Sequence, residues 1–384
     1  MIRPRAASAA LVGIGATPFT KDSGRSELAL AAEAVRAAVA DAGLVPGDVD
    51  GLVTFTMDTS PEIAVAQAAG LGELTFFSRV HYGGGAACAT VLQAALAVAS
   101  GTAEVVVCYR AFNERSGRRF GAGVRQREPS AEGVALGWML PAGLLTPASW
   151  AALAARRYLH VHGLEADVFG HVAVTARRYA ATNPAAYFHG RPITLADHAA
   201  SRWIAEPLRL LDCCQETDGG QALVVTTPER ARDLRHPPAL VRAAAQGAGR
   251  GQEQMTGFHR GEAARPPETA VVARQLWQRS GLRPADVDVA VLYDHFTPYV
   301  LMQLEEFGFC GPGEGGEFVA AGALPLNTHG GQLGEAYLHG MNGIAEAVRQ
   351  LRGTSPNQVP GAAHALVTAG AGVPTSGLIL GADG

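Results

Sequence analysis

The sequence lacks the patterns that define several classes of protein. No apolar run approaches the roughly 20 residues that a membrane-spanning helix needs, so we expect a cytoplasmic protein with no membrane contact. The formal net charge is only −4, which gives no reason to expect nucleic acid or an anionic membrane as a partner. The start, MIRPRAASAALVGIGATPF, has too short and glycine-broken an apolar stretch for a signal peptide and favours a first β-strand.

Cysteine is also scarce, and its spacing is uninformative. The odd number and the lack of any Cys-x-x-Cys pair indicate neither a disulfide framework nor a zinc ribbon. The His-Val-His run at 160–162 is a weak metal pattern, because metal centres need three or four convergent ligands. We therefore predict no metal site. The cysteines are Cys88, Cys108, Cys213, Cys214 and Cys310.

An internal repeat organises the chain. With 384 residues, 48% of them hydrophobic, the sequence predicts a globular protein of two domains or one large duplicated domain. The segment AGLVPGDVDGLV at Ala42–Val53 resembles SGLRPADVDVAV at Ser280–Val291. A helical segment precedes each copy, and a buried strand follows the Pro and Asp residues that mark the turn. AALV near Ala9 and PALV near Pro238 look like equivalent opening strands.

The two copies continue alike. A glycine-rich patch follows in each half, HYGGGAACAT in the first and NTHGGQLGEA in the second. Each patch leads into an alanine-rich helix that ends at Ser100–Gly101 or Arg352–Gly353, and each half closes with an apolar strand, AEVVVCYRA or AHALVTAGAG. Strands that alternate with helices indicate an α/β fold. We predict two βαβ-type halves, residues 1–236 and 237–384, that form a pseudo-dimer.

The first half is the longer one and contains an insertion. It lies at about 112–210, where basic helical segments with Trp and Tyr interrupt the pattern. Within it, NERSGRRFG at Asn113–Gly121 places three arginines around a small turn. That turn is either a solvated loop or a contact to ligand phosphates or to a partner chain.

Three segments carry a family resemblance: YDHFTPYVLMQLEEFGFCGPGEGG, NTHGGQLGEAYLHGMNGIAEAVRQLRG and YRAFNERSGRRFG. With the duplicated halves, they resemble the thiolase superfamily over nearly the whole chain, in particular its sterol-carrier-protein-X-like (lipid-transfer) branch. This resemblance implies a five-layer thiolase fold. The segments look most like actinobacterial steroid side-chain aldolases, which implies an acyl-CoA steroid substrate and no further cofactor. It also implies a homodimeric core that binds a DUF35 partner (an OB-fold with a zinc ribbon), hence a heterotetramer.

Position by position, the chain departs from a working thiolase. Cys88 occupies the place of the nucleophile, where a helix N-terminus is expected to lower the thiol pKa. Tyr293 in YDHF replaces the asparagine of Asn-Glu-Ala-Phe. His329 takes the place of the Gly-His-Pro histidine, although glycine replaces the proline that follows it. The second catalytic cysteine is missing, because Thr368 or Ala369 stands in its place.

These departures favour a retro-aldol cleavage over thiolysis, since thiolysis needs a base to activate CoA. A retro-aldol step needs a base at a β-hydroxyl, donors to the enolate oxygen and an acid at the enolate carbon. The resemblance implies that Tyr293 is the base. It implies that Tyr337, which begins the helix after the second patch, is the acid, and the order of the two roles stays open. Both steps need a phenol pKa shifted below its usual value of about 10.

Neighbouring side chains complete the expected site. In a strand-like stretch, His295 shares a face with the tyrosine two residues earlier and is expected to orient or activate it. Asp294 adjoins both residues. His329 is the expected donor to the thioester oxygen, while Asn327 and His339 are weaker candidates.

Three functions remain open. The first is an aldolase that cleaves a steroid-side-chain β-hydroxyacyl-CoA to a 17-ketosteroid and propionyl-CoA. The second is a thiolase or acyltransferase that uses Cys88. The third is a non-catalytic acyl-CoA-binding lipid-transfer protein, or a scaffold for its partner.

Overall fold

A computed structural model describes residues 9–117, 119–122, 133, 134, 137, 139–252 and 262–383. The first half contains β1 (Ala10–Ala16), α1 (Glu27–Asp41), β2 (Gly51–Phe55), α2 (Glu62–Ala69), β3 (Phe76–Val80), α3 (Ala87–Ala99), β4 (Val106–Asn113), α5 (Pro147–His162), α6 (Val168–Thr182), α7 (Leu195–Ala200), β5 (Trp203–Ala205), β6 (Leu208–Arg209), β7 (Asp218–Thr226) and α8 (Pro228–Ala231). The second half contains β8 (Ala239–Gly247), α9 (Pro267–Ser280), β9 (Val289–Val291), α10 (Thr297–Glu306), α11 (Gly315–Ala321), α12 (Gly331–Gly334), α13 (Met341–Arg352), β10 (His364–Ala369) and β11 (Thr375–Ala382). No helix within the described ranges is both long and apolar enough to cross a membrane.

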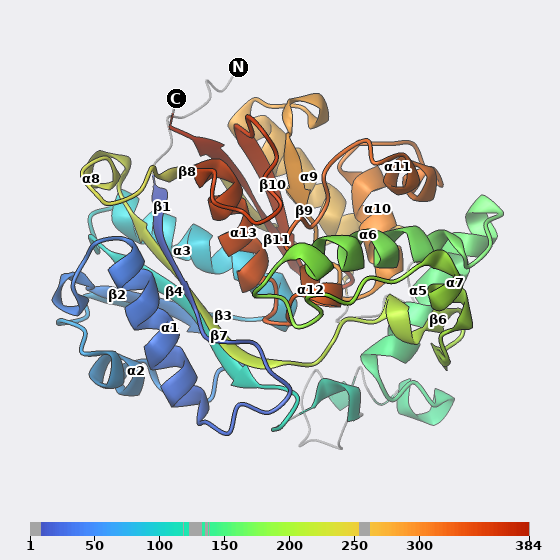
Figure 1. Ribbon diagram of the computed structural model, residues 1–384, viewed down its shortest axis with the longest axis horizontal. Helices are drawn as coiled ribbons and strands as arrows, with labels where there is room; N and C mark the ends of the chain where they lie inside the picture. Colours follow the sequence, from blue (N-terminus) through green and yellow to red (C-terminus); the bar gives the residue numbers. More distant parts are fainter. Residues whose placement is uncertain are drawn as a thin grey trace.

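The predicted repeat is present as two matching sets of elements (Figure 1). In the first half β1, α1, a helical turn at Pro46–Asp48 and β2 follow one another, and β8, α9, a turn at Pro284–Asp286 and β9 do so in the second. Ser26 caps α1 by accepting a hydrogen bond from the Ala29 N–H. Pro267 begins α9, where its fixed φ and missing N–H suit the first helical position. The shared Gly-Leu-x-Pro motif therefore marks the passage from helix to strand in both halves.

The two halves also share a strand topology. The main sheet of the described chain has the order β3-β2-β4-β7-β1-β8-β11-β10-β9. In the first half β1 and β4 run antiparallel to β7, and β2 is parallel to β4. In the second half β8 and β10 run antiparallel to β11, and β9 is parallel to β10. The halves do not close with β4 and β10 as expected. An additional antiparallel strand, β7 or β11, follows and lies between the first strand of its half and the apolar strand.

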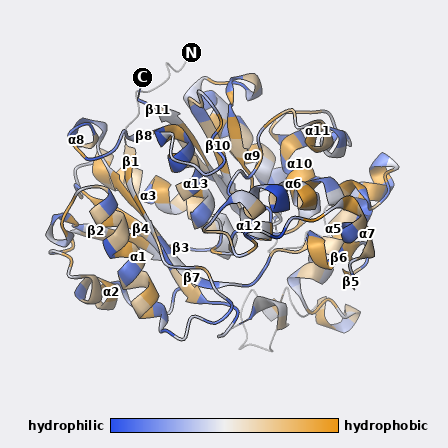
Figure 2. Cartoon of the chain, in the orientation of Figure 1, coloured by the Kyte–Doolittle hydropathy of each residue, from blue (hydrophilic) through white to orange (hydrophobic). Residues whose placement is uncertain are grey.

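The strands of the first half and those of the second half form two layers, with helices between these layers and on their outer faces, which gives five layers in all (Figure 1). α3 and α13 lie between the two strand layers and share one apolar cluster with strands of both, including Val53, Leu223, Val367 and Leu378. α1 covers the outer face of the first-half strands, and α9 with α10 covers that of the second-half strands. Apolar residues line the strands and one side of the covering helices (Figure 2). The expected five-layer thiolase arrangement is confirmed.

The insertion between β4 and β7 packs on the second half. Its helix α6 lies against α10, α11 and α12. The approach to α12 needs glycine, because a Cβ at Gly330 or Gly334 would lie 2.6 or 2.5 Å from the Ala180 methyl. Asn183, just after α6, donates from Nδ2 to the His329 carbonyl at 2.9 Å. The insertion therefore holds the second glycine patch in place.

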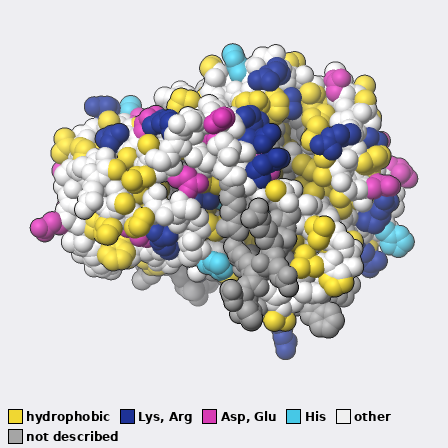
Figure 3. Space-filling model, turned by 90° about the horizontal axis from the view of Figure 1, so that it is seen from below, with side chains coloured by type: hydrophobic (Ala, Val, Ile, Leu, Met, Phe, Trp, Pro, Cys, Tyr) yellow, Lys and Arg dark blue, Asp and Glu magenta, His cyan; other side chains and the backbone are white. Residues whose placement is uncertain are grey.

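Part of the arginine-rich turn after β4 lies in the described chain. The Asp218 carboxylate accepts a hydrogen bond from the Arg115 N–H at 2.9 Å, and Arg119 pairs with Glu216 at 2.7 Å. Arg118 lies outside the described residues. The face seen in Figure 3 carries basic, acidic and apolar side chains side by side, with Lys and Arg most crowded near its middle.

The central layer should dominate the stability of the fold. Ile344 on α13 is fully buried in the shared cluster, so Ile344→Ala removes apolar contacts and leaves a cavity. We expect the free energy of unfolding, measured by urea denaturation, to fall by about 2–5 kcal/mol. Leu153 on α5 is 41% exposed, and Leu153→Ala should cost no more than about 0.5 kcal/mol. Equal losses in the two variants would contradict this placement of the core.

Candidate active site

The two glycine patches meet around the Tyr293 phenol. Tyr293 follows β9 and is 4% exposed. A Cβ at Gly84 in the first patch would lie 1.7 Å from the Tyr293 hydroxyl oxygen, and one at Gly340 after the second would lie 3.2 Å from its Cδ2. Glycine is required at Gly84 because no side chain fits between its backbone and the phenol. Both halves of the repeat thus build one site.

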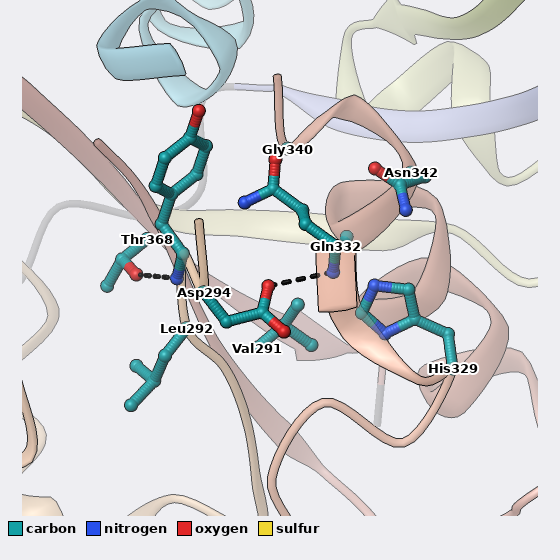
Figure 4. Close-up of a pocket in the computed structure, with 10 residues that line it drawn as sticks. Val291, Leu292, Asp294, His329, Gln332, Gly340, Asn342 and Thr368 are labelled. Carbon is teal, nitrogen blue, oxygen red and sulfur yellow. Dashed lines mark hydrogen bonds between the residues drawn. The ribbon is translucent and has the colours of Figure 1, made fainter. Parts of the chain in front are cut away.

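Thr368 on β10 fixes the backbone of Tyr293. Its Oγ1 accepts a hydrogen bond from the Tyr293 N–H at 2.9 Å (Figure 4) and donates to Gln303 Oε1 at 2.6 Å. The Gln303 amide in turn donates to the Tyr293 carbonyl at 2.9 Å. At one of the two positions where the resemblance expects a second catalytic thiol, the chain therefore has a hydroxyl that anchors a tyrosine.

The hydroxyls of Tyr293 and Tyr337 lie 3.1 Å apart and share a hydrogen bond. Thr217, just before β7, accepts from the Tyr337 N–H at 2.8 Å and donates to its carbonyl at 3.3 Å. The expectation that Tyr337 begins a helix is wrong, since it lies in the connection between α12 and α13. His339 and Gly340 adopt positive φ in this connection, which a right-handed helix does not contain.

Burial raises the pKa of both phenols well above its usual value. Desolvation disfavours the phenolate, and for Tyr337 the charge of the neighbouring Tyr293 adds to this effect. The hydrogen bond from Tyr337 offsets only part of the shift at Tyr293. The expected downward shift is therefore wrong for this structure. At neutral pH the site contains two neutral phenols joined by a hydrogen bond.

Arg110 on β4 is a buried cation close to the tyrosines. Its Nη1 pairs with the Asp58 carboxylate, and its Nε donates to His339 Nδ1 at 3.1 Å. The guanidinium lies 3.9 Å from the centroid of the Phe112 ring, which stacks on His339 at 5.1 Å. Burial and the Arg110 charge lower the pKa of His339, so its ring is neutral. The centroids of the His339 and Tyr337 rings lie 5.0 Å apart, so His339 packs against the Tyr337 ring.

His295 contacts Tyr293 through its ring. The two ring centroids lie 4.9 Å apart, and His295 also stacks on Tyr299 at 4.8 Å. Burial lowers the pKa of His295 to about 3, so the ring is neutral at physiological pH. Its Nδ1 has no hydrogen-bond partner among the residues that the structure describes. This position is compatible with the predicted orienting role.

Asp294 and Asn327 join the Tyr293 loop to the second glycine patch. Asp294 Oδ1 accepts a hydrogen bond from the Gln332 N–H at 2.8 Å (Figure 4), and burial raises the pKa of this carboxyl. Asn327 binds both backbone groups of Leu292, at 2.7 Å and 3.0 Å. Both side chains thus position the loop that carries the phenol.

A small pocket lies beside Tyr293. Its polar lining includes Tyr293, His329, Gln332 and Asn342 (Figure 4). His329 Nε2 lies 4.0 Å from Glu335 Oε2, and the same carboxylate oxygen accepts a hydrogen bond from Asn342 Nδ2 at 2.8 Å. Within the described chain His329 Nδ1 has no partner. Tyr293 and His329 thus line the same pocket, and the role of His329 as donor to the thioester oxygen stays a prediction.

Cys88 is the second residue of α3, at the helix N-terminus as expected. Its thiol is fully buried and donates to the Val367 carbonyl at 3.7 Å. Burial raises the pKa of the thiol, and a hydrogen bond with Ser376 reduces this shift only in part. The expected lowering is wrong, because desolvation outweighs the influence of the helix terminus. A buried, protonated thiol is a weak nucleophile.

Three residues of the site were not predicted from the sequence. Gln332 and Glu335 follow His329 in the second patch, and Arg110 lies in YRAF. For Arg110 the sequence offered one signal, a charged residue inside the apolar run VVVCYRA. A buried strand accepts such a cation only where another group pairs with its charge. For Gln332 the sequence offers no signal, since an amide that faces a pocket and one that faces solvent look alike.

A duplicated five-layer α/β fold with its site between the halves defines a thiolase-like protein. Residues 9–229 match the family model described as Thiolase, N-terminal domain, and residues 251–380 match Thiolase C-terminal domain-like. The chain therefore belongs to the thiolase superfamily.

Two similar proteins and one solved structure indicate a particular group within the thiolase superfamily. The chain is 65% identical to the steroid side-chain-cleaving aldolase of Thermomonospora curvata over 98% of both chains. It is also 65% identical to the 17-hydroxy-3-oxo-4-pregnene-20-carboxyl-CoA lyase of Mycobacterium tuberculosis, over 97% of this chain and 99% of that protein. The solved structure named Ltp2-ChsH2(DUF35) aldolase matches with a TM-score of 0.95 at 64% identity and covers 99% of each chain. The resemblance to steroid side-chain aldolases is thus confirmed.

Gly84→Ala should disable the site while the fold persists. The added methyl collides with the Tyr293 hydroxyl, and displacing a reacting group by about 1 Å costs on the order of 10²-fold in rate. We expect a loss of this size in the rate of substrate cleavage, with an unchanged circular dichroism spectrum. Gly47→Ala is the matched control, because nothing lies within 4 Å of its added Cβ. Full activity of Gly84→Ala would contradict the close packing of the patch on Tyr293.

Proposed function

We propose that this chain is a carbon–carbon lyase that cleaves the side chain of a steroid carried as a β-hydroxyacyl-CoA. The products are a 17-ketosteroid and propionyl-CoA. The hydrogen-bonded hydroxyls of Tyr293 and Tyr337 carry this proposal, because they supply the two proton-transfer positions of an aldol cleavage. Two relatives at 65% identity are named as a steroid side-chain-cleaving aldolase and a carboxyl-CoA lyase.

A proton relay between neutral phenols fits the buried pair. In one concerted step the β-hydroxyl proton passes to the Tyr293 oxygen, the Tyr293 proton passes to Tyr337 and the Tyr337 proton passes to the α-carbon, so neither phenol ever carries two protons. The carbon–carbon bond breaks in the same step, and the β-carbon becomes the ketone. The electron pair of the broken bond takes up the proton at the α-carbon through a transition state with thioester enolate character. Both phenols end neutral, so no buried phenolate has to form.

In the transition state of this step partial negative charge develops on the thioester oxygen. His329 is the proposed donor to it, because its imidazole lines the pocket next to Tyr293. A preorganised donor at such an oxygen contributes about 10²–10³ in rate. The thioester itself accepts the electron pair, so we propose no cofactor beyond the CoA of the substrate.

A DUF35 protein is the proposed partner. The name of the solved structure at 64% identity includes such a protein. From the resemblance we further propose an OB-fold with a zinc ribbon in that partner and a homodimeric core of this chain. One partner on each protomer would give a heterotetramer, which we place in the cytoplasm.

Removal of either phenol hydroxyl tests the function. Tyr293→Phe and Tyr337→Phe keep the rings but interrupt the relay, so each should lower kcat by about 10²–10⁴-fold. The double variant should lose little more than the worse single one, since the two hydroxyls act as a unit. The assay is release of 17-ketosteroid and propionyl-CoA by the chain with its DUF35 partner. Tyr179→Phe on α6 is the control, and unchanged activity of both site variants would refute the mechanism.

The competing enzyme function is a thiolase or acyltransferase that uses Cys88. Its buried thiol and raised pKa argue against it. We expect Cys88→Ala to keep most of the cleavage activity, and mass spectrometry after iodoacetamide trapping to find no acyl group on Cys88. An acyl-Cys88 adduct with loss of activity in the variant would favour the thiolase. Saturable binding of acyl-CoA with no turnover, even with the partner present, would favour a lipid-transfer protein.

A further inference from the structure

Gln332 has a fixed backbone and a side chain without partners. Its N–H donates to Asp294 Oδ1 at 2.8 Å, and its carbonyl accepts from the Gln215 N–H at 3.2 Å. The residue is 2% exposed, yet neither Oε1 nor Nε2 has a hydrogen-bond partner in the described part of the chain. The side chain lines the pocket that also contains Tyr293 and His329.

This arrangement is typical of a ligand site. A buried polar group that lacks a partner costs about 1–3 kcal/mol, and both ends of the Gln332 amide are in this condition. His329 Nδ1 and Asn342 Oδ1, in the same pocket, also lack partners among the described residues. Several donors and acceptors therefore converge on one small space, which a polar ligand atom would satisfy.

We propose that Gln332 is a catalytic residue that donates from Nε2 to the thioester oxygen as the enolate forms. The inference rests on the aldol cleavage proposed above and adds a second donor to the site of that reaction. The Gln332 side chain extends from α12 toward Gly340 (Figure 4). The Gln332 amide and the His329 imidazole thus line the pocket in which we place the carbonyl oxygen.

The fixed backbone makes this donor useful. Because Asp294 and Gln215 hold Gln332 before the substrate binds, little reorganisation is needed when charge develops on the oxygen. The amide also stays neutral, so it adds no buried charge to a pocket that is lined by the neutral phenol of Tyr293.

The first test compares Gln332→Leu with a matched control. The Leu variant removes both amide groups at similar volume, and in complex with the DUF35 partner we expect it to lower kcat by about 10²–10³-fold with little change in KM. Gln278→Leu, on an exposed position of α9, should leave kcat unchanged. Circular dichroism and binding to the partner check that both variants fold.

Gln332→Glu should produce a pH dependence of the rate that a purely structural role of Gln332 would not produce. Burial raises the pKa of a carboxyl at this position, so at high pH it is a carboxylate that repels the enolate and at lower pH a neutral donor. We expect its rate relative to the wild type to rise as the pH falls from about 8 to about 5. The relative rate of the Leu variant should stay flat, because leucine adds no ionisable group and the nearby ionisable side chains, Tyr293, Asp294, His329 and Glu335, are the same in all three proteins.

The outcomes of these experiments distinguish the proposed function from the proposed role of Gln332. A wild-type complex that releases no ketosteroid would overturn the proposed function itself. An active wild-type complex whose Leu variant keeps kcat within about threefold would overturn this inference alone, because the loss of an oxyanion donor is far larger. Should the Leu variant fail to fold, the nearly isosteric Glu variant decides, and a flat pH ratio would contradict the assignment.

Discussion

The hydrogen bond between the hydroxyls of Tyr293 and Tyr337 is the contact on which the rest of the site depends. It joins the loop after β9 to the connection before α13, and a threonine anchors each partner: Thr368 holds the backbone of the first and Thr217 that of the second. Glycines from both repeats leave room for the pair. The duplication of the fold therefore builds a site that neither half could build alone.

The chain retains a thiolase scaffold in an environment that suits different chemistry. Cys88 keeps its place on α3, but burial holds its thiol protonated. Thr368, at one of the two positions that correspond to the second catalytic cysteine of a working thiolase, serves instead as a backbone anchor. Desolvation penalises any reaction that needs a thiolate or a phenolate, whereas protons can pass between neutral phenols without that penalty. In the transition state partial negative charge develops at the thioester oxygen, to which His329 and Gln332 are the proposed donors.

The fold was more predictable from the sequence than the electrostatics of the site. The repeated Gly-Leu-x-Pro-x-Asp-Val-Asp motif marks the same turn twice, so the halves and their matching helices could be inferred from local signals. The resemblance also pointed to Tyr293 and Tyr337, far apart in the chain, which the structure brings together. The direction of the pKa shifts could not be predicted, because burial at Cys88 or Tyr293 comes from elements distant in sequence.

Cleavage in D₂O tests the neutral relay most directly. The tyrosine hydroxyls and the substrate hydroxyl exchange with solvent, so the proton delivered to the α-carbon is deuterium. The account predicts propionyl-CoA with one deuterium at C2, formed in equal amount to the 17-ketosteroid and without added CoA. Propionyl-CoA that contains no deuterium, or product formation that requires free CoA and passes through an acyl group on Cys88, would contradict it.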